Sequence, residues 1–380
     1  MKSDLTKEAL IQAGVSGEKA GDILEAIGRV SADQPADRAW SHLSRSILAP
    51  ELPFPVHLLV HRAVFGNWDS SQGPPPAWCP TNLDIENSNI QRFCQTLGIS
   101  PIASLHAWSV RNREKFWAQV IESLGIEFQT PPTTILDPSS SVESARWLAG
   151  AKLNITDNCF WGKKDQTAII FQPEGGSIGR LSYAELDRIS NRFANSLGHI
   201  GIRKGEAIAI AMTMTWEAVA AYLGILKAGC VVVSIADSFA PEEIATRLRI
   251  ARATTVVTQD VILRAGKTLP MYAKVVRAGA ARAIVVHAGE RPAVDLRPED
   301  RTWADFLVDD DRFAAIAGAP DDPINVLFSS GTTGEPKAIP WNHTTAIKCA
   351  MDGYLHQNLR PGEVVAGPTN LGWMMGPWLI

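Results

Sequence analysis

The sequence predicts an α/β protein with a mostly parallel sheet flanked by helices, preceded by a helical N-terminal extension. From residue 167 onward, short apolar runs alternate with helical patterns, as expected for strands that are buried on both faces. The first part of the chain shows only helical periodicity, and it is followed by three prolines, Pro74–Pro76, which no helix can cross. We therefore expect three segments: a helical extension over 1–75, with a poorly ordered extension as the alternative, a connecting segment over 76–160, and the α/β domain over 161–380.

One long helix is expected within the connecting segment. In residues 104–126 the apolar side chains recur at helical spacing. These side chains are Trp108, Phe116, Trp117, Val120, Ile121 and Leu124. An aromatic stripe at this spacing is more typical of a packed core than of a cofactor site. We therefore expect the helix to dock onto the main domain.

The α/β domain is expected to alternate strands and helices along the chain. The expected strands of its sheet are 167–172, 206–212, 230–237, 254–260, 282–290 and 324–331, and the expected helices are 181–201, 215–229 and 240–252. The helix over 181–201 places Leu186, Ile189, Phe193, Leu197 and Ile200 on one face. Because near-continuous apolar strands are typical of parallel sheets, we expect helices on both faces.

Composition excludes several classes of function. The 36 basic and 40 acidic side chains leave a formal net charge of −4, which offers no electrostatic footprint for nucleic acid or an anionic membrane. The five cysteines match neither a disulfide framework nor a zinc site, and the eight histidines show no metal-ligand spacing. No stretch approaches the roughly 20 apolar residues of a membrane span, and the N-terminus has no signal-peptide core. We expect a soluble intracellular protein.

The stretch LFSSGTTGEPKAIPWNH, residues 327–343, has the composition of a polyphosphate-binding loop. It ends a predicted buried strand, so it lies at the carboxyl end of the sheet, where α/β proteins bind ligands. Gly331 and Gly334 allow positive φ and a close approach of the backbone to an anion, and Lys337 adds a mobile charge. The hydroxyl donors are Ser329, Ser330, Thr332 and Thr333. It is not a Walker loop, because Pro336 precedes the lysine. By composition alone, a plain Gly/Thr turn explains it equally well.

The string SSGTTGEPK closely resembles TSGTTGxPKG, the phosphate-binding motif of the adenylate-forming superfamily, which includes acyl-CoA synthetases, firefly-type luciferases and peptide-synthetase adenylation domains. Ala338 stands for the final glycine of that motif, so no positive φ is expected there. LAGAKLNITDNC, residues 148–159, resembles a stretch of the acetyl-CoA synthetases, and so do residues 201–235 and the chain from 342 onward. The leading segment resembles the plant peroxisomal acyl-activating enzymes. The fold implied is an incomplete N-terminal domain of an adenylate-forming enzyme.

The resemblance implies a ligase that activates a carboxylic acid with ATP to an acyl-adenylate and transfers the acyl group to coenzyme A (CoA). The residues that would bind the ATP phosphates are Ser329, Ser330, Gly331, Thr332, Thr333, Gly334 and Lys337. Lys337, Thr332 and Thr333 are the expected catalytic residues, because neutralising the charge around the nucleotide must supply much of the catalysis. Mg²⁺ is expected with the nucleotide, and no protein ligand for it can be assigned.

By the same resemblance, Trp373, Met374 and Met375 belong to an acyl pocket. Two polarizable methionines favour an acid larger than acetate, and a plain core role stays open for them. Asn370 replaces an aspartate of the family. The positions that match CoA-binding residues are Ala236, Asp237, Ser238, Arg264 and Lys267. Asp237 stands where the family has glycine, while Arg264 suits a phosphate contact or, equally, a solvated surface.

The resemblance also implies that the chain is incomplete. The family's domain continues well beyond its phosphate loop, whereas this chain ends at Ile380. The adenine, ribose and magnesium contacts and the C-terminal catalytic lysine would then be absent, so we expect poor solubility and no turnover from these 380 residues alone. The alternatives are an adenylating module that loads a carrier protein and a non-catalytic product that binds a nucleotide or a partner. A peroxisomal location is implied, with the cytoplasm as the alternative, and the sequence identifies neither the acid nor the oligomeric state.

Overall fold

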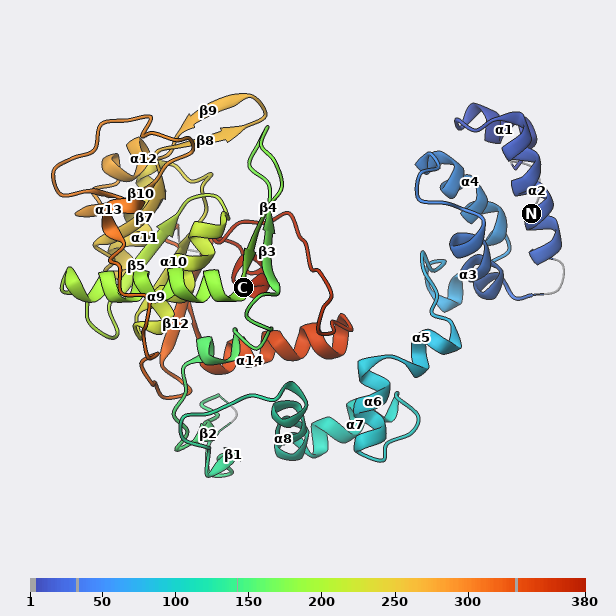
Figure 1. Ribbon diagram of the computed structural model, residues 1–380. Coiled ribbons are helices and arrows are strands. Elements are labelled where there is room, and N and C mark those ends of the chain that lie inside the picture. Colours follow the sequence, from blue (N-terminus) through green and yellow to red (C-terminus); the bar gives the residue numbers. More distant parts are fainter. Residues whose placement is uncertain (1–4, 32–33, 142, 332–333) are drawn as a thin grey trace. The chain divides into compact units, whose positions relative to one another are not determined.

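The structure is a computed structural model that describes residues 5–31, 34–141, 143–331 and 334–380. The chain forms two compact units, Met1–Ile102 and Ala103–Ile380 (Figure 1). Each unit has its own buried apolar residues. None of the described helices combines the length and the apolar character that crossing a membrane requires. The boundaries expected from the sequence, at residues 75 and 160, differ from the boundary between these two units, and the three-segment division stays a prediction.

The first unit is helical, as its periodicity predicts. Its elements are α1 (Lys7–Gln12), α2 (Gly17–Ser31), α3 (Ala36–Ser46), α4 (Phe54–Val64), the 3₁₀ turn η1 (Ser70–Gln72), α5 (Asn82–Glu86) and α6 (Asn89–Thr96). The helices α1 to α4 enclose a core in which Leu10, Ile23 and Leu43 are fully buried. The proline-rich segment packs on this bundle, because the indole N–H of Trp40 donates to the carbonyl oxygen of Ala77 at 2.7 Å.

The second unit begins with two helices where the periodicity predicts one. The helix α7 (Ser104–Arg111) ends and α8 (Arg113–Leu124) begins around Asn112, whose φ of −123° and ψ of 47° are not helical. The side-chain amide of Asn112 donates to the carbonyl oxygen of Trp108 at 3.0 Å, a local bond that competes with helical continuation. The expected docking holds for α8, since Leu124 packs against the main core.

The second unit is built on a sheet whose described strands follow the order β11-β10-β7-β5-β6-β12-β13. All neighbouring strands are parallel except β12 and β13, which are antiparallel. The strands are β5 (Ala207–Ala211), β6 (Val231–Ile235), β7 (Thr255–Gln259), β10 (Arg282–Val286), β11 (Arg301–Thr302), β12 (Pro323–Ser329) and β13 (Lys337–Asn342). Every residue of β6 is buried, as expected for a central parallel strand. The predicted α/β fold with a mostly parallel sheet is confirmed.

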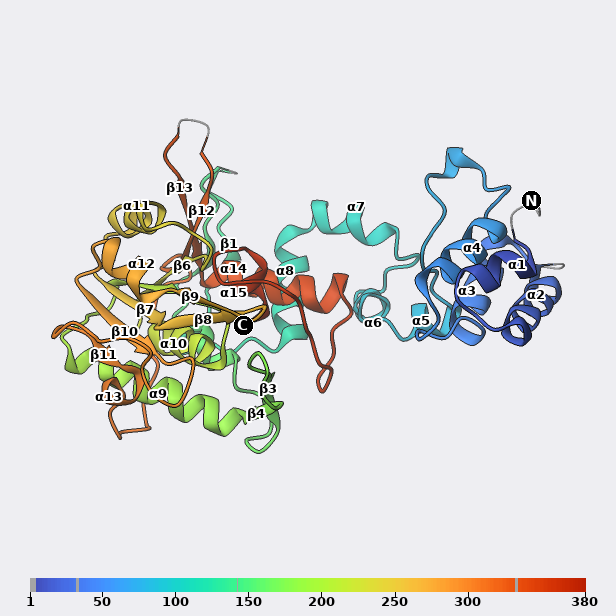
Figure 2. The ribbon, with the colours of Figure 1, turned by 90° about the horizontal axis from the view of Figure 1, so that it is seen from above.

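Helices cover both faces of this sheet (Figure 2). Phe193 of α9 and Ile225 of α10 belong to the core on one face, and Ile244 of α11 and Val275 of α12 belong to the core on the other. The helices of this unit that follow α8 are α9 (Tyr183–His199), α10 (Trp216–Lys227), α11 (Pro241–Ala251), α12 (Tyr272–Arg277), α13 (Trp303–Phe306), α14 (His343–Met351) and α15 (Met375–Leu379), with the 3₁₀ turn η2 (Ile155–Asn158) and the π-helical turn η3 (Asp352–His356).

Some strands of the described chain pair outside the main sheet. They are β1 (Thr134–Leu136) with β2 (Trp147–Ala149), β3 (Thr167–Phe171) with β4 (Gly179–Ser182), and β8 (Val261–Arg264) with β9 (Lys267–Pro270). The prediction that 167–172 belongs to the parallel sheet is wrong, because β3 pairs antiparallel with β4 alone. Ile170 on β3 is 46% exposed, so this strand lacks the two-sided burial that a strand of the central sheet requires.

Candidate functional site

The predicted phosphate loop joins β12 to β13 at the carboxyl end of the sheet. Ser329, the last residue of β12, lies opposite Lys337, the first residue of β13, so two predicted phosphate ligands stand at the base of the loop. Gly331 has a φ of +59°, and a Cβ at this position would lie 2.0 Å from the carbonyl oxygen of Glu335. Only glycine fits such a turn, as the composition of the loop predicts.

The remaining residues of the loop are placed in part. Thr332 and Thr333 lie outside the described residues, so their expected roles stay predictions. Gly334 has a φ of +90°, in the region that favours glycine. Ala338 lies in β13 opposite Phe328 without a positive φ, as expected from its replacement of a glycine.

The carboxyl end of β6 brings two of the predicted sites together. Ala236 and Asp237 directly follow β6, which is the neighbour of β12 in the sheet. Gly372 packs on this backbone, because a Cβ at 372 would lie 2.3 Å from the backbone nitrogen of Ala236. Leu371 beside it is fully buried and anchors the segment in the core. The segment predicted to bind the acyl group therefore contacts the segment predicted to bind CoA.

The three residues predicted to form the acyl pocket follow this contact. Trp373, Met374 and Met375 are 65%, 60% and 40% exposed. Asn370, which replaces an aspartate of the family, accepts the backbone N–H of Gly372 through Oδ1 at 2.9 Å and so shapes the turn that presents Trp373. The assignment of these residues to an acyl pocket stays a prediction.

The basic residues predicted to contact CoA lie on the β8–β9 hairpin. Arg264 ends β8 and Lys267 begins β9, and the two residues pair across the ladder. The guanidinium of Arg264 forms an ion pair with the carboxylate of Asp237. The Asp237 side chain is 3% exposed and that of Arg264 is 52% exposed. Asp237, which stands where the family has glycine, is thus neutralised by Arg264, a residue of the same predicted site.

Sequence reasoning missed two residues of this region. Lys274 of α12 donates through Nζ to the carbonyl oxygen of Asp237 at 3.1 Å, so a second cationic side chain besides Arg264 contacts the end of β6. Glu174, in the loop between β3 and β4, accepts hydrogen bonds from the backbone of the β8–β9 turn. No local pattern could reveal either contact, because the partners are separated by 37 and by 91 residues or more.

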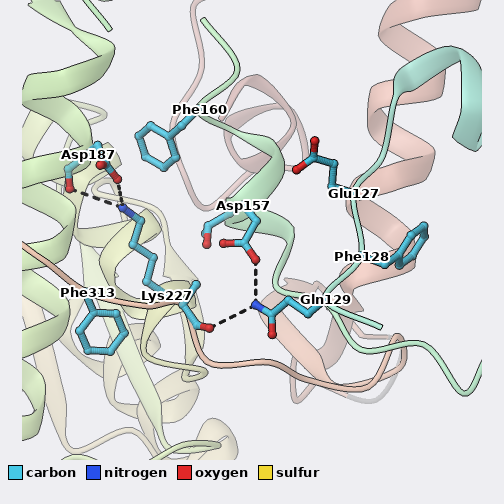
Figure 3. Close-up of a pocket in the computed structure, with 10 residues that line it drawn as sticks. Glu127, Phe128, Gln129, Asp157, Phe160, Asp187, Lys227 and Phe313 are labelled. Carbon is cyan, nitrogen blue, oxygen red and sulfur yellow. Dashed lines mark hydrogen bonds and ion pairs between the residues drawn. The ribbon is translucent and has the colours of Figure 1, made fainter. Parts of the chain in front are cut away.

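A cavity of about 400 Å³ is lined by residues from distant parts of the second unit, among them Gln129, Asp157 and Lys227 (Figure 3). Lys227, the last residue of α10, lines it shortly before β6 begins. Its ammonium group donates to the carboxylate of Asp187, to the hydroxyl of Ser190 at 2.8 Å and to the side-chain oxygen of Asn191 at 2.7 Å. Burial lowers the pKa of Lys227, and the hydrogen bond to Asp187 opposes this shift. Because its three N–H groups are engaged by side chains of α9, Lys227 links α10 to α9.

Three family models match successive parts of the chain. Residues 160–380 match the model of the AMP-binding enzymes, and residues 102–159 match that of the acetyl-coenzyme A synthetase N-terminus. Residues 3–66 match a model described as the SAM domain of probable acyl-activating enzyme 17/18. The resemblance stated from the motif SSGTTGEPK is confirmed.

Individual proteins match the chain along most of its length. Two proteins of Arabidopsis thaliana, the peroxisomal probable acyl-activating enzymes 18 and 17, are 37% and 38% identical to it over 99% and 100% of the chain. Hexanoyl-CoA synthase of Cannabis sativa is 37% identical over 97% of the chain. The chain spans only 55–56% of the length of these relatives.

A solved structure shows the same architecture. Acetoacetyl-CoA synthetase from Streptomyces lividans superposes with a TM-score of 0.74 at 27% identity, covering 80% of this chain and 49% of that one. The matching model of the AMP-binding enzymes spans 160–380, which is more than half of the chain, so the chain belongs to the family of AMP-binding enzymes.

Proposed function

We propose that the protein is an AMP-forming acyl-CoA synthetase, which joins a carboxylic acid to the AMP moiety of ATP and then to CoA. The observation that carries the proposal is the meeting of the phosphate loop, the Gly372 segment and Asp237 at one edge of the sheet, after the adjacent strands β12 and β6. Ligands of α/β proteins bind at this edge. The match to the acetyl-coenzyme A synthetase N-terminus favours CoA, and not a carrier protein, as the acceptor of the acyl group.

The first step requires the neutralisation of a polyphosphate. An oxygen of the carboxylate attacks the α-phosphorus of ATP, and the bond to the pyrophosphate oxygen breaks without a net transfer of a proton. The hydroxyls of Ser329 and Ser330, the loop amides and the ammonium of Lys337 would stabilise the negative charge on the departing pyrophosphate. Thr332 and Thr333 are proposed to extend this set of donors.

The second step transfers the acyl group to sulfur. The CoA thiolate attacks the acyl carbonyl, the bond to the AMP oxygen breaks, and the thiol proton passes to solvent. The basic side chains of Arg264 and Lys267 would hold phosphate groups of CoA, with Lys274 nearby. The backbone of Ala236, Asp237 and Ser238 is proposed to line the path of the CoA arm toward the acyl carbonyl.

Mg²⁺ is proposed to accompany ATP. In nucleotide sites it takes most of its ligands from phosphate oxygens and water, with one or two carboxylates. Within the described ranges, no group of three or more His, Cys, Asp or Glu side chains is placed to hold a metal ion. The hydroxyls, amides and ammonium group of the loop are hydrogen-bond donors and fit phosphate oxygens, and no step is assigned to Mg²⁺.

The proposed substrate is an acid with an apolar chain larger than acetate, since Trp373, Met374 and Met375 offer flexible apolar surface. The relative named hexanoyl-CoA synthase supports this class of acid, and the two relatives named as peroxisomal support a peroxisomal location.

Acid-dependent exchange between ATP and labelled pyrophosphate tests the first step, and CoA-dependent thioester formation tests the second. We expect no turnover from these 380 residues alone, whereas a protein of the relatives' full length that contains this chain should catalyse exchange with aliphatic acids and form their CoA thioesters. Exchange together with acylation of a carrier protein, and no CoA thioester, would favour the loading alternative. The absence of exchange by that longer protein with every acid of a series from acetate to decanoate would overturn the proposal.

A further inference from the structure

The backbone amides of the turn between β8 and β9 bind a carboxylate. Ala265 and Gly266 form this two-residue turn with φ values of +52° and +71°, the positive pair typical of a type I′ hairpin. The Glu174 carboxylate accepts the N–H of Ala265 through Oε2 at 2.8 Å and the N–H of Gly266 through Oε1 at 2.7 Å. Successive backbone N–H groups that converge on one anion are also the arrangement by which loops bind phosphate.

The carboxylate comes from a distant part of the chain. Glu174 lies in the loop between β3 and β4, the hairpin that stands outside the parallel sheet, and the ends of the two hairpins lie side by side (Figure 1). The contact is therefore tertiary. It brings the negative charge of Glu174 to the backbone amides at the turn of the predicted CoA-binding hairpin.

The charges around this turn are balanced. Arg264 and Lys267 flank the turn, and they are matched by the carboxylates of Asp237 and Glu174. An incoming phosphate must therefore displace one of the two carboxylates. The Asp237 side chain is 3% exposed and is paired with Arg264. If a phosphate took Arg264 away from it, the Asp237 carboxylate would remain as an unpaired charge in the protein interior. Glu174 is exposed, and water can solvate it once it leaves.

We propose that Glu174 competes with a phosphate group of CoA for the amides of Ala265 and Gly266, so that CoA binds fully only after this carboxylate has left the turn. The inference rests on the proposed CoA site. Glu174 thereby lowers the apparent affinity for CoA in proportion to the time it occupies the turn. It also keeps the hairpin amides satisfied when no phosphate is bound.

The test is CoA binding by isothermal titration calorimetry with the unmodified protein, Glu174→Gln and Glu290→Gln. Glu290 is also exposed and also lies beyond a carboxyl end of the sheet, after β10, so its variant removes the same charge from the same edge. We expect the dissociation constant of CoA to fall between about threefold and tenfold in Glu174→Gln and to stay unchanged in Glu290→Gln. Thermal unfolding of each variant checks the fold.

An unchanged or higher dissociation constant in Glu174→Gln overturns the inference, and so does an equal fall in both variants, which would reflect net charge only. Arg264→Gln separates this failure from that of the CoA site itself. If Arg264→Gln weakens CoA binding while Glu174→Gln has no effect, the site stands and the competition is refuted. If the unmodified protein binds no CoA, both the inference and the proposed second step fail.

Discussion

The guanidinium of Arg264 pairs with the carboxylate of Asp237, and this ion pair ties the β8–β9 hairpin to the end of β6. The Asp237 side chain is 3% exposed, so without its partner it would be an unpaired charge in the protein interior. The hairpin that carries the predicted CoA contacts is thus positioned by a tertiary ion pair.

The first prediction concerns this ion pair. Arg264→Gln should lower the free energy of unfolding by about 1–3 kcal/mol, less than for a fully buried pair because the arginine is 52% exposed. Arg249→Gln, which breaks the exposed pair with Glu335, should change it by less than about 0.5 kcal/mol. Urea denaturation measures both. Adding Asp237→Asn to Arg264→Gln should recover part of the loss, and equal effects of the two arginine variants would contradict the prediction.

The second prediction concerns Gly331. In Gly331→Ala the new Cβ would meet the Glu335 carbonyl oxygen at 2.0 Å, so the loop must change shape. In a protein of the relatives' full length that contains this chain, we expect pyrophosphate exchange to fall by about 10–100-fold, since small misplacements of binding groups have effects of that size. Gly279→Ala is the control, because Gly279 also has positive φ, +79°, with no atom within 4 Å of its Cβ position. The prediction fails if the two variants retain the same exchange rate.

The third prediction concerns the contact of Gly372 with Ala236. Gly372→Ala would place a methyl group 2.3 Å from a backbone nitrogen, and we expect a loss of about 1–3 kcal/mol in the free energy of unfolding, as for overpacked cores. Gly367→Ala is a control, because its Cβ would meet only a side-chain carbon of Leu379 at 3.5 Å. A Gly372→Ala variant as stable as the control would show that the two segments are not packed together.

The fourth prediction is a pH dependence. His343, the first residue of α14, is buried, and its Nδ1 accepts the backbone N–H of Ile155 at 3.2 Å. Burial lowers the pKa of His343 to about 4, with Asp322 raising it and Lys204 lowering it further. The unfolded chain binds the proton near pH 6.5 and the folded chain only near pH 4, so stability is complete above pH 6.5 and declines as the pH falls toward 4.

The size of this decline is at most about 3 kcal/mol, from the difference between the two pKa values. His343→Asn keeps an acceptor close to the position of Nδ1 but cannot take the proton. We expect its free energy of unfolding to change less between pH 7 and pH 4.5 than that of the unmodified protein, as measured by urea denaturation at a series of pH values. Parallel curves would refute the role of His343.

The fifth prediction concerns the buried ammonium of Lys227. Lys227→Met keeps the length of the side chain but leaves Ser190 and Asn191 without their donor, and should destabilise the protein by about 1–3 kcal/mol. Lys348→Met removes a half-exposed pair with Asp352 and should cost less than about 0.5 kcal/mol. Thermal and urea unfolding compare the two. A smaller effect at Lys227 than at Lys348 would show that the buried bonds add no net stability.

Much of the fold could be predicted because its signals are local. The apolar run of β6 and the amphipathic pattern of α9 depend only on residues near each other in the chain, and both elements form where expected. The one misplaced strand, β3, has an apolar composition but half-exposed side chains. Composition cannot distinguish a strand of the central sheet from one of an outer hairpin, because burial is settled by what packs against it.

The sequence by itself determined the family and the place of the predicted phosphate loop, because a short motif after a buried strand carries both within a few residues. It also determined which glycines of that loop take positive φ. Only the tertiary structure decided that Asp237 neutralises Arg264, that Gly372 packs on Ala236 and that Glu174 fills the β8–β9 turn. These contacts join residues far apart in the chain, and they depend on how hairpins and loops pack at the edge of the sheet, which no local pattern encodes.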